Sequence, residues 1–290
     1  MGRILLLIVC LRSSCFALGI GETFVISEDK YIPLFTSEGI KFEYEAGPHG
    51  TNCYDLDTVL PPGTFVKVLN EEKNSTVYVF CKVSERCSFN GFIHAKFFEH
   101  SMRSLDSSMF DLMAPSRDVP NFQETCKMLN SYRETEIPYA WGCNNLDEVN
   151  LEGLYTFVRK NSNDQGNPSY RCAGLDCSGI LHRISSWTLP HSTGQLYNLS
   201  QGKCLYELDE KTSDDELRMV LKFIKDTDFV VCPKVHVIIS LHGGFIEAKG
   251  RNYGVVYTDA AHAMGELKKL IKRGTVRVIR WHPKLLDQET

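Results

Sequence analysis

Residues 174–179 place a cysteine between an acid and a serine, with a glycine close by on either side. The apolar residues Ile180, Leu181 and Ile184 follow at helical spacing, which puts Cys177 in the first turn of an amphipathic helix. There the unpaired backbone N–H groups and the positive end of the helix dipole stabilise a negative charge such as a thiolate. The pattern favours a nucleophilic cysteine, and the alternative is a core cysteine at a helix start.

The neighbours of Cys177 suit a reactive position. Asp176 stands at the expected N-cap, where its carboxylate can accept a hydrogen bond from a free backbone N–H. Gly174 and Gly179 let the backbone turn sharply and let another segment approach closely.

A nucleophilic thiol needs a general base, and His236 begins an apolar strand pattern over residues 236–241. Taken alone, a histidine in this place is more often a satisfied core residue. Glu247 lies in the next strand pattern and can orient the imidazole. The predicted chemistry is a thiolate on Cys177, with His236 as general base and acid and Glu247 as its support.

The hairpin between these two strands decides whether the histidine and the carboxylate meet. A two-residue turn at Gly243 and Gly244 pairs Ser240 with Glu247, so that His236 and Glu247 share a face of the sheet. In this register their backbones lie about 13 Å apart along the strand, which is long for a direct hydrogen bond. A shifted register or a β-bulge would close the distance, and both alternatives are kept.

The predicted secondary structure differs between the two parts of the chain. Residues 20–112 carry short strand patterns separated by turn residues, which predicts a small all-β barrel or sandwich. Residues 113–290 mix helices and strands, and the expected linker is 112–120. The clearest patterns are strands at 23–27, 63–69, 76–83, 91–98 and 275–281, helices beginning at Asn121 and Ser213 with capping boxes, and a helix at 262–273.

Composition bounds the class of protein. The chain has 290 residues, of which 43% are hydrophobic and 23% charged, as in globular proteins. Its net charge of −4, with no basic stripe, gives no reason to expect a nucleic-acid partner.

The N-terminus predicts a secretory signal peptide over 1–19, because it has a positive charge at Arg3, an apolar run at 4–11 and small residues at 17–19. Cys15 suggests lipidation instead, which Arg12 disfavours. The apolar run is too short to span a bilayer, and no other segment is expected to cross one.

Nine of the eleven cysteines remain once residues 1–19 are removed. In an oxidising compartment an odd number leaves at least one free thiol, which we expect to be Cys177; the alternative is that all nine are reduced. Cys81 and Cys87 flank one turn and are the expected pair. No C-x-x-C motif is present, so that a zinc ribbon is not expected and no metal or other cofactor is predicted.

Four stretches, taken in order, resemble the NlpC-type cysteine peptidases of bacterial cell walls. They are "PYAWG" (138–142), "GLDCSGILHR" (174–183), "LPHSTGQ" (189–195) and "HVIISLHGGFIEA" (236–248). "LPPGTFVKVL" (60–69) with "NGFIHAKFF" (90–98) resembles a bacterial SH3-like domain. The resemblance implies an α+β fold, with an SH3-like β-barrel over 20–112 followed by a papain-like cysteine peptidase domain over 113–290.

The resemblance also implies residue roles. Cys177 matches the nucleophile and His236 the base. Glu247 stands where the family has a histidine, His191 replaces an arginine, Cys143 replaces a glycine, and residues 143–172 are an insertion near the cleft. The residues that match cleft positions are Tyr139, Trp141, Asp176, Ser178 and Thr193, with Ser192 as the alternative to Thr193.

The resemblance implies the function of a secreted cysteine endopeptidase that acts on peptidoglycan stem peptides, at the bond between D-γ-glutamate and a diamino acid. The predicted location is the periplasm or cell envelope. One alternative is an amidase or acyltransferase of the same fold, because fold does not fix substrate. The other is a catalytically inactive wall-binding module, against which the presence of both Cys177 and His236 counts.

Overall fold

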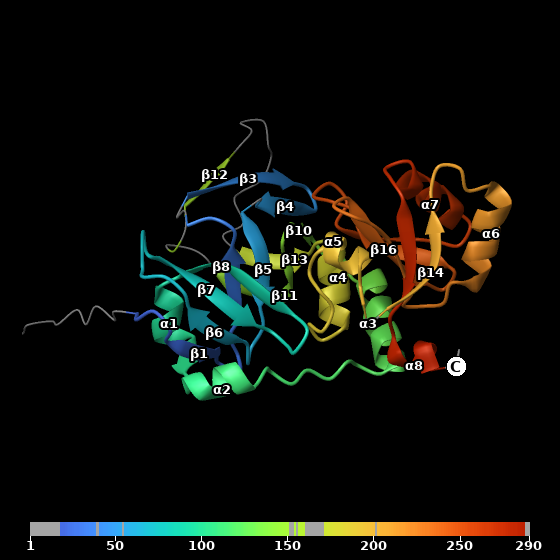
Figure 1. Cartoon of the computed structure of the whole chain (residues 1–290). Helices are drawn as coiled ribbons and strands as arrows, with labels where there is room; N and C mark the ends of the chain where they lie inside the picture. The colour runs from blue at the N-terminus through green and yellow to red at the C-terminus, as the bar shows by residue number, and fades with distance from the viewer. Residues whose placement is uncertain are drawn as a thin grey trace, which may run out of the picture.

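A computed structural model of the chain describes residues 18–38, 41–53, 55–150, 154, 156–159, 171–200 and 202–287 (Figure 1). Most of the expected signal peptide, 1–19, lies outside these residues, as does much of the expected insertion at 143–172. Within the described ranges, no helix combines the length and the apolar character that crossing a bilayer requires. The structure is of the mixed α+β class, with three sheets.

The first sheet has seven strands in the order β5-β2-β8-β7-β6-β1-β9. The strands are β1 (Thr23–Ile26), β2 (Ile32–Phe35), β5 (Leu56–Leu60), β6 (Phe65–Val68), β7 (Thr76–Lys82), β8 (Ser88–His94) and β9 (Met102–Ser104). Alternate side chains such as Val66, Val68, Val77 and Val79 are fully buried, which is the two-residue period that the sequence predicted.

The expected closed barrel is not present among the described residues, because no pairing joins the edge strands β5 and β9. The β5 edge is met instead by a later segment, whose Asn144 donates a hydrogen bond to Thr58 in β5. Strand β8 ends at His94, so the prediction of a strand through residue 98 is wrong: residues 96–98 begin helix α1 (Lys96–His100), and helix α2 (Ser107–Leu112) follows.

A second sheet combines strands from both sides of residue 112. Its strands are β3 (Lys41–Gly47), β4 (Gly50–Cys53), β10 (Tyr139–Ala140), β11 (Asn144–Asn150), β12 (Thr156–Arg159) and β13 (Arg171–Leu175), in the order β11-β13-β10-β4-β3-β12. Strand β10 runs parallel to β4, with Tyr139 opposite Gly50, and β12 runs parallel to β3. The two parts of the chain therefore share a sheet, and a division into domains at residue 112 stays a prediction.

The third sheet lies between two layers of helices (Figure 1). Its strands, in the order β14-β19-β15-β16-β17-β18, are β14 (Lys203–Leu208), β15 (Phe229–Cys232), β16 (His236–Leu241), β17 (Gly244–Ala248), β18 (Val255–Thr258) and β19 (Val276–Arg280). The helices are α3 (Phe122–Glu134), α4 (Cys177–Ile184), α5 (Thr193–Tyr197), α6 (Asp214–Phe223), α7 (Ala263–Ile271) and α8 (Pro283–Leu286).

Burial on both faces explains the continuous apolar run of β16. Val237 and Ile239 pack in a core with residues of α3 and α4, whereas Ile238 packs in a second core with residues of α6 and α7. Both predicted capping boxes are confirmed, since the side chains of Asn121 and Ser213 each accept from the backbone N–H three residues on.

The segment between α2 and α3 coincides with the expected linker, but it is held against the rest of the molecule. Arg117 donates from Nε to the Val83 carbonyl at 3.1 Å and from Nη2 to the Pro62 carbonyl. Its guanidinium also lies 5.5 Å from the ring centre of Trp187. The segment thus connects the first sheet with the part of the chain that follows α4.

All eight cysteines whose side chains are described are free, Cys177 among them. The expected pairing of Cys81 with Cys87 is wrong. Both thiols are buried in the core of the first sheet, where they pack as small apolar side chains.

Candidate active site

Helix α4 begins at Cys177, as the sequence predicted. Asp176 is the N-cap, and its Oδ1 accepts from the backbone N–H of Gly179 at 2.6 Å. Ile180, Leu181 and Ile184 are fully buried, so the apolar stripe fixes the helix against the core. The first-turn position of Cys177 therefore follows from a cap on one side and packing on the other.

Gly179 is needed for a close approach, because a Cβ at this position would overlap with the carbonyl oxygen of Cys143. We expect Gly179→Ala to lower the free energy of unfolding by about 1–3 kcal/mol, measured by urea denaturation. Gly265→Ala in α7 is the matched control, because a Cβ there meets no atom within 4 Å. The control should be neutral or stabilising by up to about 1 kcal/mol. Equal effects of the two changes would contradict the assigned role of Gly179.

The hairpin of β16 and β17 differs from the expected one by one residue. Leu241 pairs with Gly244, so that the turn consists of His242 and Gly243, whose φ angles are 50° and 75°. Two positive φ values are the signature of a type I′ turn. Gly244 instead belongs to β17, where a Cβ would overlap with the Thr258 carbonyl oxygen of the neighbouring strand.

This register brings His236 and Glu247 together. If the ladder is continued by one pair, Glu247 stands opposite Ile238, and His236 is its diagonal neighbour on the same face. His236 Nε2 lies 2.6 Å from Glu247 Oε2. Lys249 Nζ lies 3.4 Å from the other carboxylate oxygen, Oε1, within ion-pair distance. The buried carboxylate thus faces two cationic groups.

Cys177 completes the arrangement, because its side chain interacts with His236 and is among the causes that raise the pKa of the imidazole. Burial alone would lower the pKa of His236, but the hydrogen bonds and charges of Cys177 and Glu247 raise it to about 10. Burial likewise opposes ionisation of Glu247, yet His236 and Lys249 hold its pKa below the ordinary value. The neighbours of His236 thus favour the protonated form of its imidazole.

A cavity of about 460 Å³ opens at this group. All eight site residues predicted from the sequence line it: Tyr139, Trp141, Asp176, Cys177, Ser178, Thr193, His236 and Glu247. Trp141 is 44% exposed, whereas Tyr139 is 7% exposed and belongs to the core as well as to the cavity wall. Ser178 Oγ donates to Asp176 at 3.1 Å, and Ser192 also lines the cavity.

A buried network beneath the cavity was not predicted. His191 contacts Asp176 Oδ1 through Nε2 at 3.0 Å and Thr58 Oγ1 through Nδ1 at 2.9 Å. Burial would lower the pKa of His191, but Asp176 raises it above the ordinary value. Asp176 also accepts from the Gly142 N–H at 2.9 Å, and His191 holds the pKa of this carboxyl low against the effect of burial.

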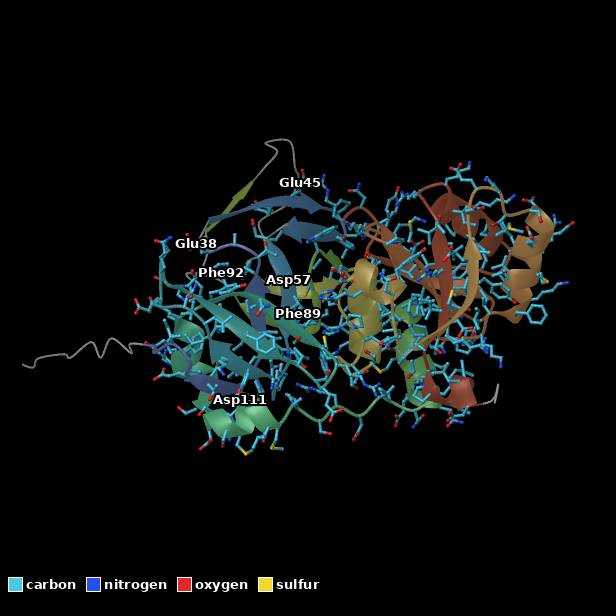
Figure 2. All side chains as sticks on the ribbon, in the orientation of Figure 1. Glu38, Glu45, Asp57, Phe89, Phe92 and Asp111 are labelled. Carbon is cyan, nitrogen blue, oxygen red and sulfur yellow. The ribbon has the colours of Figure 1, made fainter. Side chains whose placement is uncertain are left out.

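Asp57 is a second cavity residue that the sequence analysis missed. It belongs to β5 of the first sheet (Figure 2), together with Leu56, which also lines the cavity. Burial raises the pKa of Asp57. Nothing near residue 57 resembles the motifs of the later segment, so only the fold could place it at the site.

Among the described residues, no group of three or more histidine, cysteine or acidic side chains is arranged to hold a metal ion. No protein-family model matches the sequence, and the search of curated proteins returned no match. Among solved structures, the chain is similar to NlpC1 from Trichomonas vaginalis, with 10% identity over 91% of this chain and 94% of the other. The TM-score of this match is 0.28, which is too low to support an inference about fold or activity.

Proposed function

We propose that the chain is a cysteine peptidase in which Cys177 is the nucleophile, His236 the general base and acid, and Glu247 the group that orients the imidazole. The observation that carries the proposal is the 2.6 Å contact of His236 with the buried Glu247 carboxylate, in a cavity that Cys177 also lines and beside a thiol that raises the pKa of the same imidazole. This is the relation of nucleophile, base and orienting group that covalent catalysis needs.

The reaction follows from the positions of these groups. The Cys177 thiolate attacks the scissile carbonyl carbon, and the backbone N–H groups at the start of α4 can donate to the oxyanion that forms. The His236 imidazolium gives its proton to the leaving amine, which breaks the C–N bond and leaves a thioester on Cys177. Neutral His236 then takes a proton from water, and the resulting attack releases the acid and restores the thiolate.

For the substrate, we propose peptidoglycan stem peptides cut between D-γ-glutamate and a diamino acid, by an exported enzyme of the cell envelope. The ordered motifs at 138–142, 174–183, 189–195 and 236–248 support this choice, and each motif contributes residues to the one cavity. The first sheet, proposed to be the SH3-like part, contributes Leu56 and Asp57 to the same cavity. A wall-binding module without activity would have no use for the contact of Cys177 with His236.

The test is to incubate the full chain with peptides containing D-γ-glutamyl–diaminopimelate and to identify the fragments by mass spectrometry. We expect one cut, at that bond, and none when iodoacetamide has blocked Cys177. Peptides left intact by protein whose Cys177 reacts rapidly with iodoacetamide would refute the substrate and favour an amidase or acyltransferase acting on another amide.

The pH profile tests the role of Glu247. Because His236 must be protonated to serve the leaving amine, kcat/KM should fall as pH rises through the pKa of about 10. Glu247→Gln removes a charge that raises this pKa, so we expect the alkaline limb to move to lower pH by about one unit or more. Lys249→Gln is the control: it removes a cation from beside Glu247, and should not move the limb downward. An unchanged limb in Glu247→Gln would remove Glu247 from the proposed machinery.

A further inference from the structure

The position of His236 relative to Cys177 determines on which side of the sulfur each half of a substrate lies. The group that protonates the leaving amine must face it, so the fragment that leaves lies on the His236 side of Cys177. Beyond His236 the cavity wall is made by α7 and by the turn between β15 and β16. We propose that Lys234 and Arg273, which line this part of the wall, form a subsite for a free carboxylate on the leaving fragment. This inference rests on the proposed function.

Both cations are placed close to His236 by the fold. Lys234 lies in the turn two residues before His236, and its backbone N–H donates to Thr193 Oγ1 at 3.0 Å, which holds the turn against the start of α5. Arg273 follows the end of α7, and its charge acts on the Cys232 thiol. Cys232 is the strand partner of His236, so the guanidinium lies beside the same end of β16.

The charges of this wall do not cancel. Lys249 and Lys269 also line the cavity, but both form ion pairs with Glu266, at 3.3 and 2.7 Å. Lys234 and Arg273 have no acidic side chain within ion-pair distance in the described part of the chain. Both are exposed, so an arriving anion need not displace an existing partner.

The other side of the cavity is lined by two acidic residues, Asp57 and Asp176, together with His191, whose charge acts on both. Asp57 comes from β5, and β5 and α7 lie on opposite sides of α4 (Figure 1). A carboxylate beside Asp57 would meet a like charge, whereas one beside Arg273 would meet an opposite charge. The cavity thus favours a substrate whose leaving part is anionic. For a stem peptide, this is a short fragment that ends in a free carboxylate near the cut bond, or a diamino acid that carries a carboxylate on its side chain.

Pairs of substrates that differ in one carboxylate distinguish the terminal carboxylate from the side-chain carboxylate of the diamino acid. The leaving fragment is made with a carboxylate or a carboxamide at its end, and with diaminopimelate or lysine as its first residue. Exposed charges contribute little individually, so we expect each useful carboxylate to raise kcat/KM by a factor of about two to five per cation. In Lys234→Gln and in Arg273→Gln, we expect this preference for carboxylate over carboxamide substrates to be lost. Lys272→Gln, next to Arg273 but outside the cavity wall, is the matched control and should keep the preference.

A second measurement needs no peptide. The ratio of Cys177 alkylation rates with iodoacetate and with iodoacetamide reports the local charge, and we expect it to fall about two- to fivefold in Lys234→Gln and Arg273→Gln. A fall without any cleavage of stem peptides would leave the anion subsite standing and refute the proposed function. Cleavage with equal rates for acid and amide substrates, and an unchanged alkylation ratio in the variants, would overturn the subsite alone.

Discussion

Cys177→Ala should abolish peptide turnover, and His236→Ala should reduce it by about a thousandfold or more. In the proposed mechanism the two groups act as one unit, since His236 assists the attack of Cys177 and later protonates the leaving amine. For the same reason, the double variant should be little worse than Cys177→Ala alone. The measurement is kcat/KM on the stem peptide, with the melting temperature checked for each variant.

Cys204→Ala is the matched control, because Cys204 is an exposed thiol away from the cavity. It should turn over substrate at the normal rate. Full activity in Cys177→Ala would overturn the cysteine-peptidase proposal, whatever the behaviour of His236→Ala. A loss in His236→Ala that is exactly additive with that in Cys177→Ala would mean that the two side chains act separately.

Asp176→Ala should lower the free energy of unfolding by about 3–5 kcal/mol. The change removes the N-cap of α4, the acceptor for the Gly142 N–H and the only carboxylate that the structure places in contact with buried His191 among the described residues. Asp57→Ala is the control from the same cavity. Burial raises the pKa of Asp57, so its loss should be neutral or stabilising.

The cost of Asp176→Ala should depend on pH in a defined way. Folding raises the pKa of His191. The stability that His191 contributes is therefore fully present at pH values below the ordinary pKa of histidine, and it is lost as pH rises through the raised pKa. Folding lowers the pKa of Asp176. The stability that Asp176 contributes is therefore present at pH values above the ordinary pKa of a carboxyl group, and it is lost as pH falls through the lowered pKa. Urea denaturation across pH should therefore show the largest difference from the wild type between these limits. A difference that does not change with pH would exclude the ion pair as its cause.

Local signals in the sequence predicted that α4 begins at Cys177 and predicted both capped helices, because a cap and an apolar stripe lie within a few residues of each other. The hairpin register was missed for a physical reason. Two adjacent glycines suggest a turn, but Gly244 is a glycine because a neighbouring strand passes close to it. His242 adopts the positive φ that the pattern assigned to a glycine.

Features that depend on distant parts of the chain could not be predicted. The contact of His191 with Thr58 joins the third motif to a strand of the first sheet. The second sheet includes β10, which has only two residues and therefore carries no periodic pattern of its own. Asp57 enters the cavity only because these pairings bring β5 beside α4.

The parallel pairing of β10 with β4 bears on when the thiol becomes competent during folding. Tyr139 and Gly50 are far apart in sequence, and contacts of this kind form slowly because a long loop must close first. On a chain that emerges N-terminus first, the β3–β4 hairpin waits with one edge of β4 unpaired until β10 arrives. Leu56, Asp57 and Trp141 can face Cys177 only after that closure. Because Tyr139 precedes Cys177 in the chain, this closure can take place before α4, which begins at Cys177, has been made.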